Sequence, residues 1–400
     1  MQTEVKGIVI IGNGIAGLSA AEAARKQDEN IPITIISNEK YLTYYRLRLC
    51  EFIGKALDSN SLNVHPLSWY EDRNIEVLLN KTVMLVNAAE KLIQLHDGLQ
   101  LSYHKLIIAS GSFSFIPPVA DTPQNVIMSL WNMDDVYGLN DEVEHIRHAA
   151  IVGGGLLGLE AAYHMNKQGI KTTIIEFMPR LLPNQLDEHG SRIFASKVKS
   201  LGIDIITGST VQSIIGTERV EKVVLNTGKI IDAQLVFSAA GVRPNLSMVK
   251  STHVNINKRI IVDQFMRTSD ADIYAAGDVA EYNNKWLGLW SAAMSQGKIA
   301  GTNAAGGQME YKLETPPYFL NSMDTKIFSI GDIGRDMSSA YETIQCVNEE
   351  DYLYQKLFFK NNKIMGAILI GDTKNSNKIS IAIKNGMTKN ECQDLISEYE

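Results

Sequence analysis

Short apolar runs alternate with Ala- and Gly-rich stretches, and this pattern occurs twice along the chain. In the first round the apolar runs are residues 8–11 and 33–36, and the stretch between them has a helical pattern to about Lys26. In the second round the apolar runs are 150–152 and 172–175, again with a helical pattern between them. Apolar runs of this length separated by helical patterns are typical of parallel β-α-β units. The sequence therefore predicts two such units.

The two rounds also correspond further downstream. Residues 91–103 contain two strand-like runs around an Asp-Gly turn, and residues 222–231 repeat that arrangement around a turn containing Gly228. Both are hairpin signals. Each round then closes with an apolar strand that runs into small residues, at 106–111 and at 235–241. We interpret the chain as a duplication with one nucleotide site in each copy.

A third segment begins near Tyr311 and has a different pattern. Strand-like runs at 327–330, 352–359 and 364–370 are followed by helix-like residues. The fold class predicted is α/β, with two Rossmann-like three-layer domains and a small α+β C-terminal domain. The predicted domains are 1–113 together with 239–310, then 114–238, then 311–400.

Each of the two units carries a GxGxxG run between its first strand and its helix. The glycines are Gly12, Gly14 and Gly17 in the first unit and Gly153, Gly155 and Gly158 in the second, 141 residues later (153 minus 12). In such a run the first glycine permits a tight turn, the second lets the backbone approach a phosphate, and the third lets helix and strand pack closely. The helix N-terminus supplies free N–H groups and partial positive charge. Each unit is therefore predicted to bind a dinucleotide.

Acidic residues follow at the distance expected of ribose ligands. Glu176 ends the second strand of the second unit, 23 residues past Gly153 (176 minus 153). A carboxylate there accepts hydrogen bonds from the ribose hydroxyls and repels a 2′-phosphate, which favours NADH over NADPH. Arg180 lies close enough in the sequence to leave NADPH open. In the first unit Glu39 is the candidate, with an ordinary surface glutamate as the alternative.

Composition and charge narrow the class of protein. Apolar residues make up 45% of the 400 residues, charged residues 21%, and the formal net charge is −7. This balance argues against nucleic acid or an anionic membrane as the main partner. The three cysteines, Cys50, Cys346 and Cys392, form no CxxC pair, so no metal site and no intramolecular redox disulfide is predicted. Few unpaired cysteines, no membrane span and no signal peptide favour the cytoplasm.

One further run carries a resemblance to a known family. Residues 268–280 contain a strand that ends in small residues and Gly277-Asp278. This run resembles the second FAD fingerprint of the pyridine nucleotide-disulfide oxidoreductase superfamily, and the order of motifs matches that family along the whole chain. The resemblance implies that FAD and NADH are the cofactors, and that Asp278 binds the ribityl chain of the flavin.

The resemblance extends to particular positions. It implies an FAD site made of Gly12, Gly14, Gly17, Glu39, Arg46, Ser110, Gly111, Gly277 and Asp278. It implies an NAD site made of Gly153, Gly155, Gly158, Glu160, Glu176 and Gly241. Glu160 is expected near the nicotinamide or the flavin ring, with a helix-surface glutamate as the alternative.

The segment around residue 46 decides the subgroup. Disulfide reductases of this family carry a redox cysteine that aligns near Leu47, so Cys50 is out of register and is interpreted as a small buried apolar residue. Residues 44–49 instead resemble NADH:rubredoxin reductases and the N-terminal module of assimilatory nitrite reductase large subunits. Ferredoxin reductases have a lysine where this chain has Glu51. Arg46 and Arg48 are candidate flavin or phosphate contacts, with salt bridges at a helix end as the alternative.

These interpretations lead to one expected function and three rivals. We expect hydride transfer from NADH to FAD and electron transfer to a small carrier such as rubredoxin or another iron–sulfur protein. The rivals are a cysteine-independent NADH oxidase, a redox-sensing binding protein, and a remnant of a disulfide reductase. The sequence does not decide whether the chain forms a homodimer through its C-terminal domain.

Overall fold

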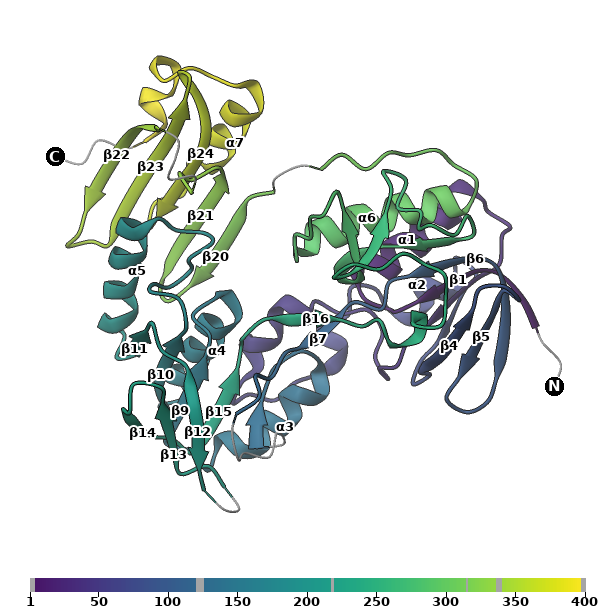
Figure 1. Ribbon diagram of the computed structural model, residues 1–400, viewed down its shortest axis with the longest axis horizontal. Coiled ribbons are helices and arrows are strands. Elements are labelled where there is room, and N and C mark those ends of the chain that lie inside the picture. The colour runs from purple at the N-terminus through teal and green to yellow at the C-terminus, as the bar shows by residue number, and fades with distance from the viewer. Residues whose placement is uncertain (1–3, 120–125, 217–218, 314–315, 336–339, 397–400) are drawn as a thin grey trace. The chain divides into compact units, whose positions relative to one another are not determined.

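The computed structural model describes residues 4–119, 126–216, 219–313, 316–335 and 340–396 (Figure 1). These residues belong to two compact units. The first comprises residues 1–48, 57–113 and 242–314, and the second comprises 49–56, 114–241 and 315–400. Within the described residues, no helix combines the length and apolarity that a membrane crossing requires.

The first unit is built on a parallel sheet with the strand order β3-β2-β1-β6-β18. Its strands are β1 (Glu4–Ile11), β2 (Ile33–Ile36), β3 (Ile75–Leu78), β6 (Gln100–Ile108) and β18 (Ile273–Ala275). The antiparallel strands β4 (Val83–Asn87) and β5 (Leu92–Leu95) extend the sheet from the first part of β6. Strands β17 (Ile260–Val262) and β19 (Ala280–Tyr282) form a separate pair. The β5–β6 hairpin confirms the predicted one, except that the runs predicted at 99–103 and 106–108 form the single strand β6.

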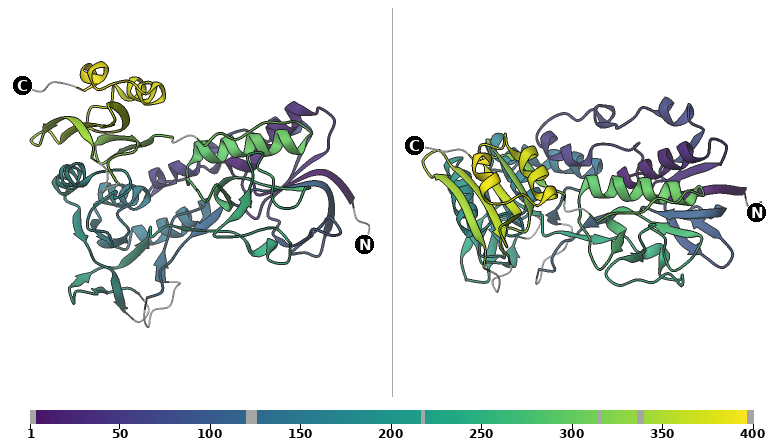
Figure 2. Two further views of the ribbon diagram at one scale, coloured as in Figure 1. Left: turned by 45° about the horizontal axis from the view of Figure 1, so that its top comes forward. Right: turned by 90° about the horizontal axis from the view of Figure 1, so that it is seen from above.

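Two helices of the first unit pack closely together. They are α1 (Ile15–Gln27) and α6 (Trp290–Ala304), which lie side by side in both views of Figure 2. A Cβ added at Gly297 would lie 2.1 Å from the carbonyl oxygen of Ala16, and one added at Gly301 would lie 2.0 Å from that of Ala20. The two backbones can approach this closely only because α6 has glycine at both positions. The short helix α2 (Leu67–Glu71) completes the unit.

Replacing Gly301 tests this close approach. We expect Gly301→Ala to lower the free energy of unfolding by about 1–3 kcal/mol, since the new methyl group meets rigid backbone. Gly138→Ala is the matched control, because a Cβ there would meet only the Met128 methyl at 3.8 Å and alanine favours a helix by about 0.5–1 kcal/mol. Urea unfolding of both cofactor-free variants measures the difference. Equal midpoints would show that the α1–α6 contact is looser than described.

The second unit contains a second parallel sheet, in the order β11-β10-β9-β15-β8. Its strands are β8 (Ile127–Met128), β9 (His148–Val152), β10 (Lys171–Glu176), β11 (Asp204–Thr207) and β15 (Leu235–Ser238). The antiparallel strands β12 (Val211–Ile215), β13 (Lys222–Leu225) and β14 (Ile230–Asp232) form a separate small sheet. The helices are α3 (Met133–Val143), α4 (Leu156–Lys167) and α5 (Glu188–Ser200).

The C-terminal part of the second unit is a five-stranded antiparallel sheet with one α-helix. Its strands run in the order β20-β21-β24-β23-β22. They are β20 (Tyr318–Ser322), β21 (Thr325–Gly331), β22 (Glu342–Asn348), β23 (Leu353–Lys360) and β24 (Lys363–Ile370), and the helix is α7 (Ser376–Asn385). Phe328, Phe359 and Ile379 lie in the core between this sheet and α7. The α/β class with two Rossmann-like folds and a small α+β domain is thereby confirmed.

One early segment of the chain belongs to the second unit. Residues 49–56 group with the second unit, although they lie within the range 1–113 predicted for the first. Hydrogen bonds from Asn140 of α3 to the backbone of this segment account for the difference. The predicted domain bounds, and the cofactor assigned to each domain, stay predictions.

Candidate functional site

The first glycine-rich turn has the geometry that its sequence predicts. Gly12 has φ of 109°, and a Cβ added there would lie 2.1 Å from the carbonyl oxygen of Ala109. A Cβ added at Gly17 would lie 1.9 Å from the carbonyl oxygen of Gly12. A Cβ added at Gly14 would meet nothing within 4 Å. Gly12 and Gly17 are therefore required by packing, whereas the space at Gly14 is open.

The second turn repeats this arrangement. Gly153 has φ of 119°, and its added Cβ would lie 2.5 Å from the carbonyl oxygen of Ala239. The added Cβ of Gly158 would lie 2.0 Å from the carbonyl oxygen of Gly153, and that of Gly155 would meet nothing within 4 Å. In both turns the open glycine is the residue before the helix, so it lies where the first backbone N–H groups of the helix are exposed.

This geometry fits a bound pyrophosphate in each turn. Free N–H groups and the partial positive charge of a helix N-terminus attract an anion, and the open space at Gly14 and Gly155 lets its oxygens approach the backbone. Asn13 adds a second observation in the first turn. Its Oδ1 accepts a hydrogen bond of 2.8 Å from Thr43, while its buried Nδ2 has no partner among the described residues. A buried donor without a partner is costly, and a ligand oxygen in the turn would satisfy it.

Glu176 is fixed at the second turn. Its carboxylate is buried at the end of β10 and accepts hydrogen bonds from the backbone N–H groups of Gly154 and Met178. These bonds hold the negative charge beside the glycine-rich turn. Arg180 is the basic residue whose position in the sequence leaves NADPH as an alternative nucleotide. Its guanidinium donates to the carbonyl oxygen of Pro183 at 3.3 Å. The arrangement agrees with a preference for a ribose hydroxyl over a 2′-phosphate.

We expect Glu176→Gln to raise the Kd for NADH by about 10- to 100-fold. The substitution removes the charge from a hydrogen bond to ribose, which is worth roughly 1.5–3 kcal/mol. The affinity for NADPH should fall much less, because the repulsion of the 2′-phosphate is lost at the same time. Binding titrations with both nucleotides measure the ratio. Equal losses for NADH and NADPH would contradict the assignment of Glu176 to the ribose.

In the first unit, two predicted site residues lie against each other. Arg46 donates to Glu39 at 2.6 Å, and the Tyr44 hydroxyl donates to the other oxygen of the same carboxylate at 2.7 Å. Arg46 and Glu39 thus form an ion pair at the start of a short 3₁₀ helix, which is the kind of contact given as the alternative for Arg46. Contacts of Glu39, Arg46 and Arg48 with a flavin nucleotide stay predictions.

Asp278 has partners that the sequence did not reveal. Its carboxylate accepts hydrogen bonds from the Ser112 hydroxyl at 2.6 Å and from the Trp286 indole at 3.0 Å. Arg259 lies over the Trp286 ring, 3.7 Å from its centroid, and donates to the backbone oxygen of Asp278. The carboxylate of Asp278 is therefore held in a defined orientation. A tryptophan eight residues after a Gly-Asp pair carries no recognised motif, so sequence reasoning missed it.

The remaining predicted positions lie at strand ends. Ser110 and Gly111 follow β6, and the Ser110 hydroxyl donates to the carbonyl oxygen of Asn245 at 2.8 Å. Gly241 takes the corresponding place after β15. The Gly277 N–H donates to the Gln296 side chain at 2.9 Å, next to Asp278. Carboxyl ends of parallel strands are where open α/β sheets bind ligands, so all of these positions suit the predicted sites.

Cys50 is buried beside two carboxylates. Burial raises the pKa of its thiol, and the charges of Glu160 and Glu51 raise the pKa further. A thiol in these surroundings stays protonated, and the protonated form is a poor nucleophile. The surroundings of Cys50 therefore agree with a packing role.

We expect Cys50→Ala to keep NADH-dependent turnover within about twofold of the original chain. The reason is that the thiol is buried and protonated, so it takes no part in electron transfer. Steady-state rates with a fixed acceptor test this, and alkylation of the native chain followed by mass spectrometry is the accompanying check. A loss of turnover with intact folding would revive the disulfide-reductase rival.

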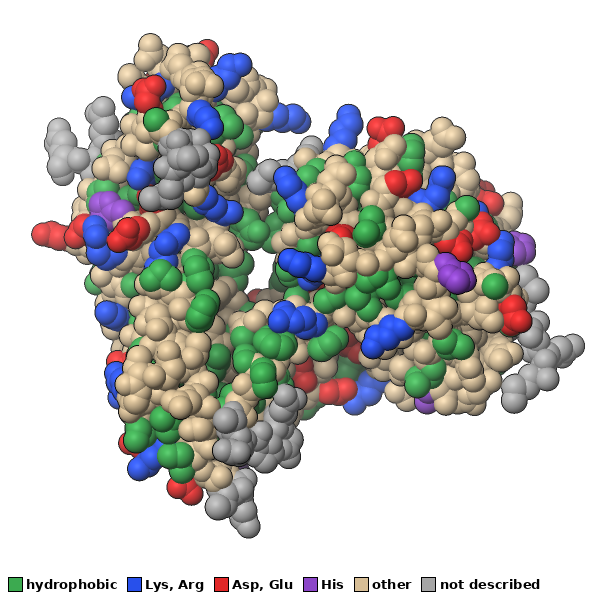
Figure 3. Space-filling view, in the orientation of Figure 1, with side chains coloured by type: hydrophobic (Ala, Val, Ile, Leu, Met, Phe, Trp, Pro, Cys, Tyr) green, Lys and Arg blue, Asp and Glu red, His purple; other side chains and the backbone are tan. Residues whose placement is uncertain are grey.

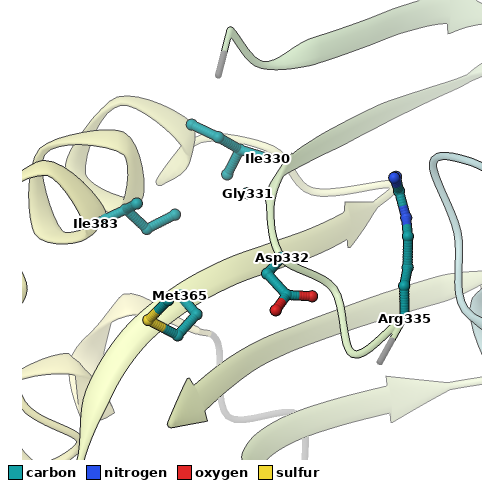
Figure 4. Close-up of a pocket in the computed structure, with 6 residues that line it drawn as sticks. All are labelled: Ile330, Gly331, Asp332, Arg335, Met365 and Ile383. Atoms are coloured by element: carbon teal, nitrogen blue, oxygen red, sulfur yellow. The ribbon is translucent and has the colours of Figure 1, made fainter. Parts of the chain in front are cut away.

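A shallow pocket of about 430 Å³ lies in the C-terminal part (Figure 4). Ile330, Met365 and Ile383 supply its apolar lining, and Asp332 brings one carboxylate into it. The Tyr341 hydroxyl already donates to that carboxylate at 2.6 Å. None of the lining residues is a predicted site residue, and the pocket has no assigned chemistry.

Comparison with known families identifies the class of protein. Residues 6–297 match the family described as pyridine nucleotide-disulphide oxidoreductase, and residues 316–387 match the rubredoxin NAD+ reductase C-terminal domain. The chain belongs to the pyridine nucleotide-disulphide oxidoreductases. It is a flavin-dependent oxidoreductase of that family, as the sequence predicted.

Particular relatives narrow the subgroup. The chain is 36% identical to the NADH-rubredoxin oxidoreductase of Clostridium acetobutylicum over 94% of both chains. The crystal structure of NADH:rubredoxin oxidoreductase from that organism has a TM-score of 0.82 with this chain, at 35% identity and 96% coverage of both. The chain is also 30% identical to a Bacillus subtilis nitrite reductase, of which it covers 46%. Residues 44–49 resemble NADH:rubredoxin reductases and nitrite reductases, and both kinds of protein are thus among the relatives of this chain.

Proposed function

We propose that this protein oxidises NADH through a bound FAD and passes the electrons to a small electron-carrier protein such as rubredoxin. The observation that carries the proposal is the pair of glycine-rich turns, each with open space at a helix N-terminus. The match of the C-terminal part to the rubredoxin NAD+ reductase C-terminal domain supports the choice of acceptor. When bound, a flavin accepts a hydride and returns electrons singly, and the protein needs to supply no acid–base pair for this chemistry.

The residues divide between the two nucleotides. The FAD site would use the turn of Gly12, Gly14 and Gly17, with Glu39, Arg46, Ser110, Gly111, Gly277 and Asp278. The NADH site would use the turn of Gly153, Gly155 and Gly158, with Glu160, Glu176 and Gly241. In this assignment Asp278, which Ser112 and Trp286 hold in place, would accept hydrogen bonds from the hydroxyls of the ribityl chain.

The three cysteines and the absence of a disulfide motif support a reducing compartment, so we place the protein in the cytoplasm. On the face seen in Figure 3, basic and acidic side chains are interspersed. A mixed surface agrees with a protein partner better than with nucleic acid, which would require an extended basic surface.

An acceptor screen tests the proposal. The purified yellow protein is given NADH and, separately, rubredoxin, ferredoxin, dioxygen and a disulfide. We expect rubredoxin to give the highest turnover, with dioxygen consumption below a tenth of that rate. Faster dioxygen consumption would favour the oxidase rival. Slow turnover with every acceptor would favour the redox sensor, and either result would overturn the choice of rubredoxin.

A further inference from the structure

The loop between β10 and α5, residues 177–187, connects the second glycine-rich turn with the C-terminal sheet. It begins directly after Glu176, and its last residue, Asp187, caps α5. Residues near the middle of this β10–α5 loop contact the turn, and Asp187 contacts β23. The turn, the loop and β23 all belong to the second unit.

Two buried leucines hold the loop against the turn. The Leu182 N–H donates to the carbonyl oxygen of Gly154 at 3.1 Å. A Cβ added at Gly154 would lie 2.6 Å from Cδ2 of Leu181 and 3.1 Å from Oε2 of Glu176. The Gly154 N–H donates to that same Glu176 carboxylate. A displaced loop would therefore disturb both the turn and the carboxylate.

The backbone of the loop has a conformation that needs support. Leu182 has φ of 46°, in the left-handed region that leucine rarely adopts. Such a conformation persists only where the surrounding contacts hold it. Gln185 and Leu186 both donate backbone N–H groups to the carbonyl oxygen of Leu182 at 2.9 Å. The hydroxyl of Ser191 in α5 donates to that of Leu181 at 2.8 Å. The shape of the loop thus depends on the position of α5.

Asp187 attaches the start of α5 to the C-terminal sheet. Its Oδ1 accepts from the Gly190 N–H at 2.9 Å, which caps the helix. Its Oδ2 accepts from the Tyr354 hydroxyl at 2.6 Å and from the Lys356 ammonium at 2.9 Å. Tyr354 is buried, and the side chains of Lys356 and Asp187 are only 18% and 17% exposed. Charge-assisted hydrogen bonds shielded in this way are stronger than ion pairs on the surface.

Further contacts join the same elements. A Cβ added at Gly190 would lie 3.0 Å from the Tyr354 ring, and the His189 ring lies 5.1 Å from it between centroids. The Arg335 guanidinium donates to the carbonyl oxygen of Asn184 in the loop. Figure 1 shows α5 beside the C-terminal strands. The C-terminal sheet therefore supports the loop at more than one point.

We infer that Tyr354 and Lys356 of the C-terminal sheet are positioning residues for NADH, which act through Asp187 and the β10–α5 loop on the second glycine-rich turn. The inference rests on the proposed function, which assigns NADH to that turn. A turn held in its binding conformation spends less of the binding energy on ordering itself. Breaking the link to β23 should therefore weaken NADH binding. FAD binding should not change, because all of these contacts lie in the second unit.

Tyr354→Phe tests the link, because it removes the hydroxyl and keeps the ring that packs against Gly190. Calorimetry with the oxidised holoenzyme measures the Kd for ADP-ribose, which has the ribose and the pyrophosphate but no nicotinamide. We expect this Kd to rise about 3- to 30-fold. KM for NADH should rise with it, while kcat at saturating NADH and the FAD content stay within about twofold. A general loss of structure would lower kcat and FAD content as well.

Asp187→Ser separates the helix cap from the link to the sheet. The serine hydroxyl can accept from the Gly190 N–H, but serine lacks the second oxygen to which Tyr354 and Lys356 donate. We expect Asp187→Ser to weaken ADP-ribose binding at least as much as Tyr354→Phe. Adding Tyr354→Phe to Asp187→Ser should then change the Kd by less than about twofold, since both break one link.

Tyr318→Phe is the matched control, because it removes a tyrosine hydroxyl from β20, which is separated from β23 by two strands of the same sheet. It should leave every value unchanged. An unchanged Kd for ADP-ribose in Tyr354→Phe, or fully additive losses in the combined variant, would overturn the inference. If Tyr354→Phe does not fold, Lys356→Met decides by the same measurements. An original chain that binds no ADP-ribose would instead reject the proposed function.

Discussion

Gly14→Val is expected to give a folded but colourless chain. Gly14 has φ of −82°, which valine adopts without strain, and its added Cβ would meet no protein atom within 4 Å. The branched side chain would instead occupy the space assigned to the FAD pyrophosphate. Losing two hydrogen bonds between backbone N–H groups and a charged phosphate costs roughly 3–6 kcal/mol, or about 10²- to 10⁴-fold in affinity. The flavin absorbance of the purified chain, per mole of protein, measures the effect.

A colourless chain has lost either FAD binding or folding, and urea unfolding distinguishes the two. Cofactor-free forms of Gly14→Val and of the original chain should unfold at the same urea concentration, within about 0.5 kcal/mol. Gly138→Ala is the control, because it also adds atoms at a glycine with room for them but lies in α3, outside both turns. A Gly14→Val chain that stays fully yellow would place the flavin elsewhere.

Gly155→Val is expected to remain yellow and to lose its response to NADH. Gly155 is the equivalent open position of the second turn, with φ of −85°. Valine there blocks the nicotinamide dinucleotide and leaves the first turn intact. The loss of two hydrogen bonds to the phosphate predicts an NADH affinity weaker by about 10²- to 10⁴-fold. Anaerobic mixing at fixed NADH concentration, followed by flavin absorbance, measures the effect.

Chemical reduction provides the control for this variant. Dithionite should bleach the flavin of Gly155→Val as completely as that of the original chain, since it does not use the nucleotide site. Flavin loss from Gly155→Val, or bleaching by NADH at the original rate, would show that the two turns are not assigned correctly. Together the two valine variants distinguish one site from the other.

The parts of the fold that the sequence predicted depend on local chemistry. A backbone φ of 109° or 119° strongly favours glycine, because few other residues adopt that conformation. The glycines in the sequence therefore indicate these two turns. The apolar runs that precede Gly12 and Gly153 are short and continuous, as buried parallel strands require. The duplicated turns, their helices and the β5–β6 hairpin were therefore predictable.

The parts that were missed depend on contacts between distant residues. Nothing near Gly297 or Gly301 indicates that the backbone of α1, 281 residues earlier in the sequence (297 minus 16), lies against them. The contact between Trp286 and Asp278 joins residues on either side of β19, and no motif marks that stretch of the sequence. Hydrophobic periodicity specifies which face of an element is buried, but it does not specify the element that covers it.

The surroundings of Glu160 were missed for the same reason. Glu51 attracted notice only through the resemblance to ferredoxin reductases, and its surroundings depend on where residues 49–56 lie. Asn140 of α3 and Gln168 at the end of α4 form hydrogen bonds with the backbone of that segment, which belongs to the same unit as Glu160. Burial is the main cause of the raised pKa of the Glu160 carboxyl, and burial is a property of packing, so no local pattern could reveal it.

An anaerobic titration of the purified chain with NADH tests the proposed function most directly. We expect about one FAD per chain, bleached completely by one equivalent of NADH, because one glycine-rich turn is assigned to each nucleotide. A chain that takes up no FAD, or an FAD that stays oxidised in excess NADH, would contradict it.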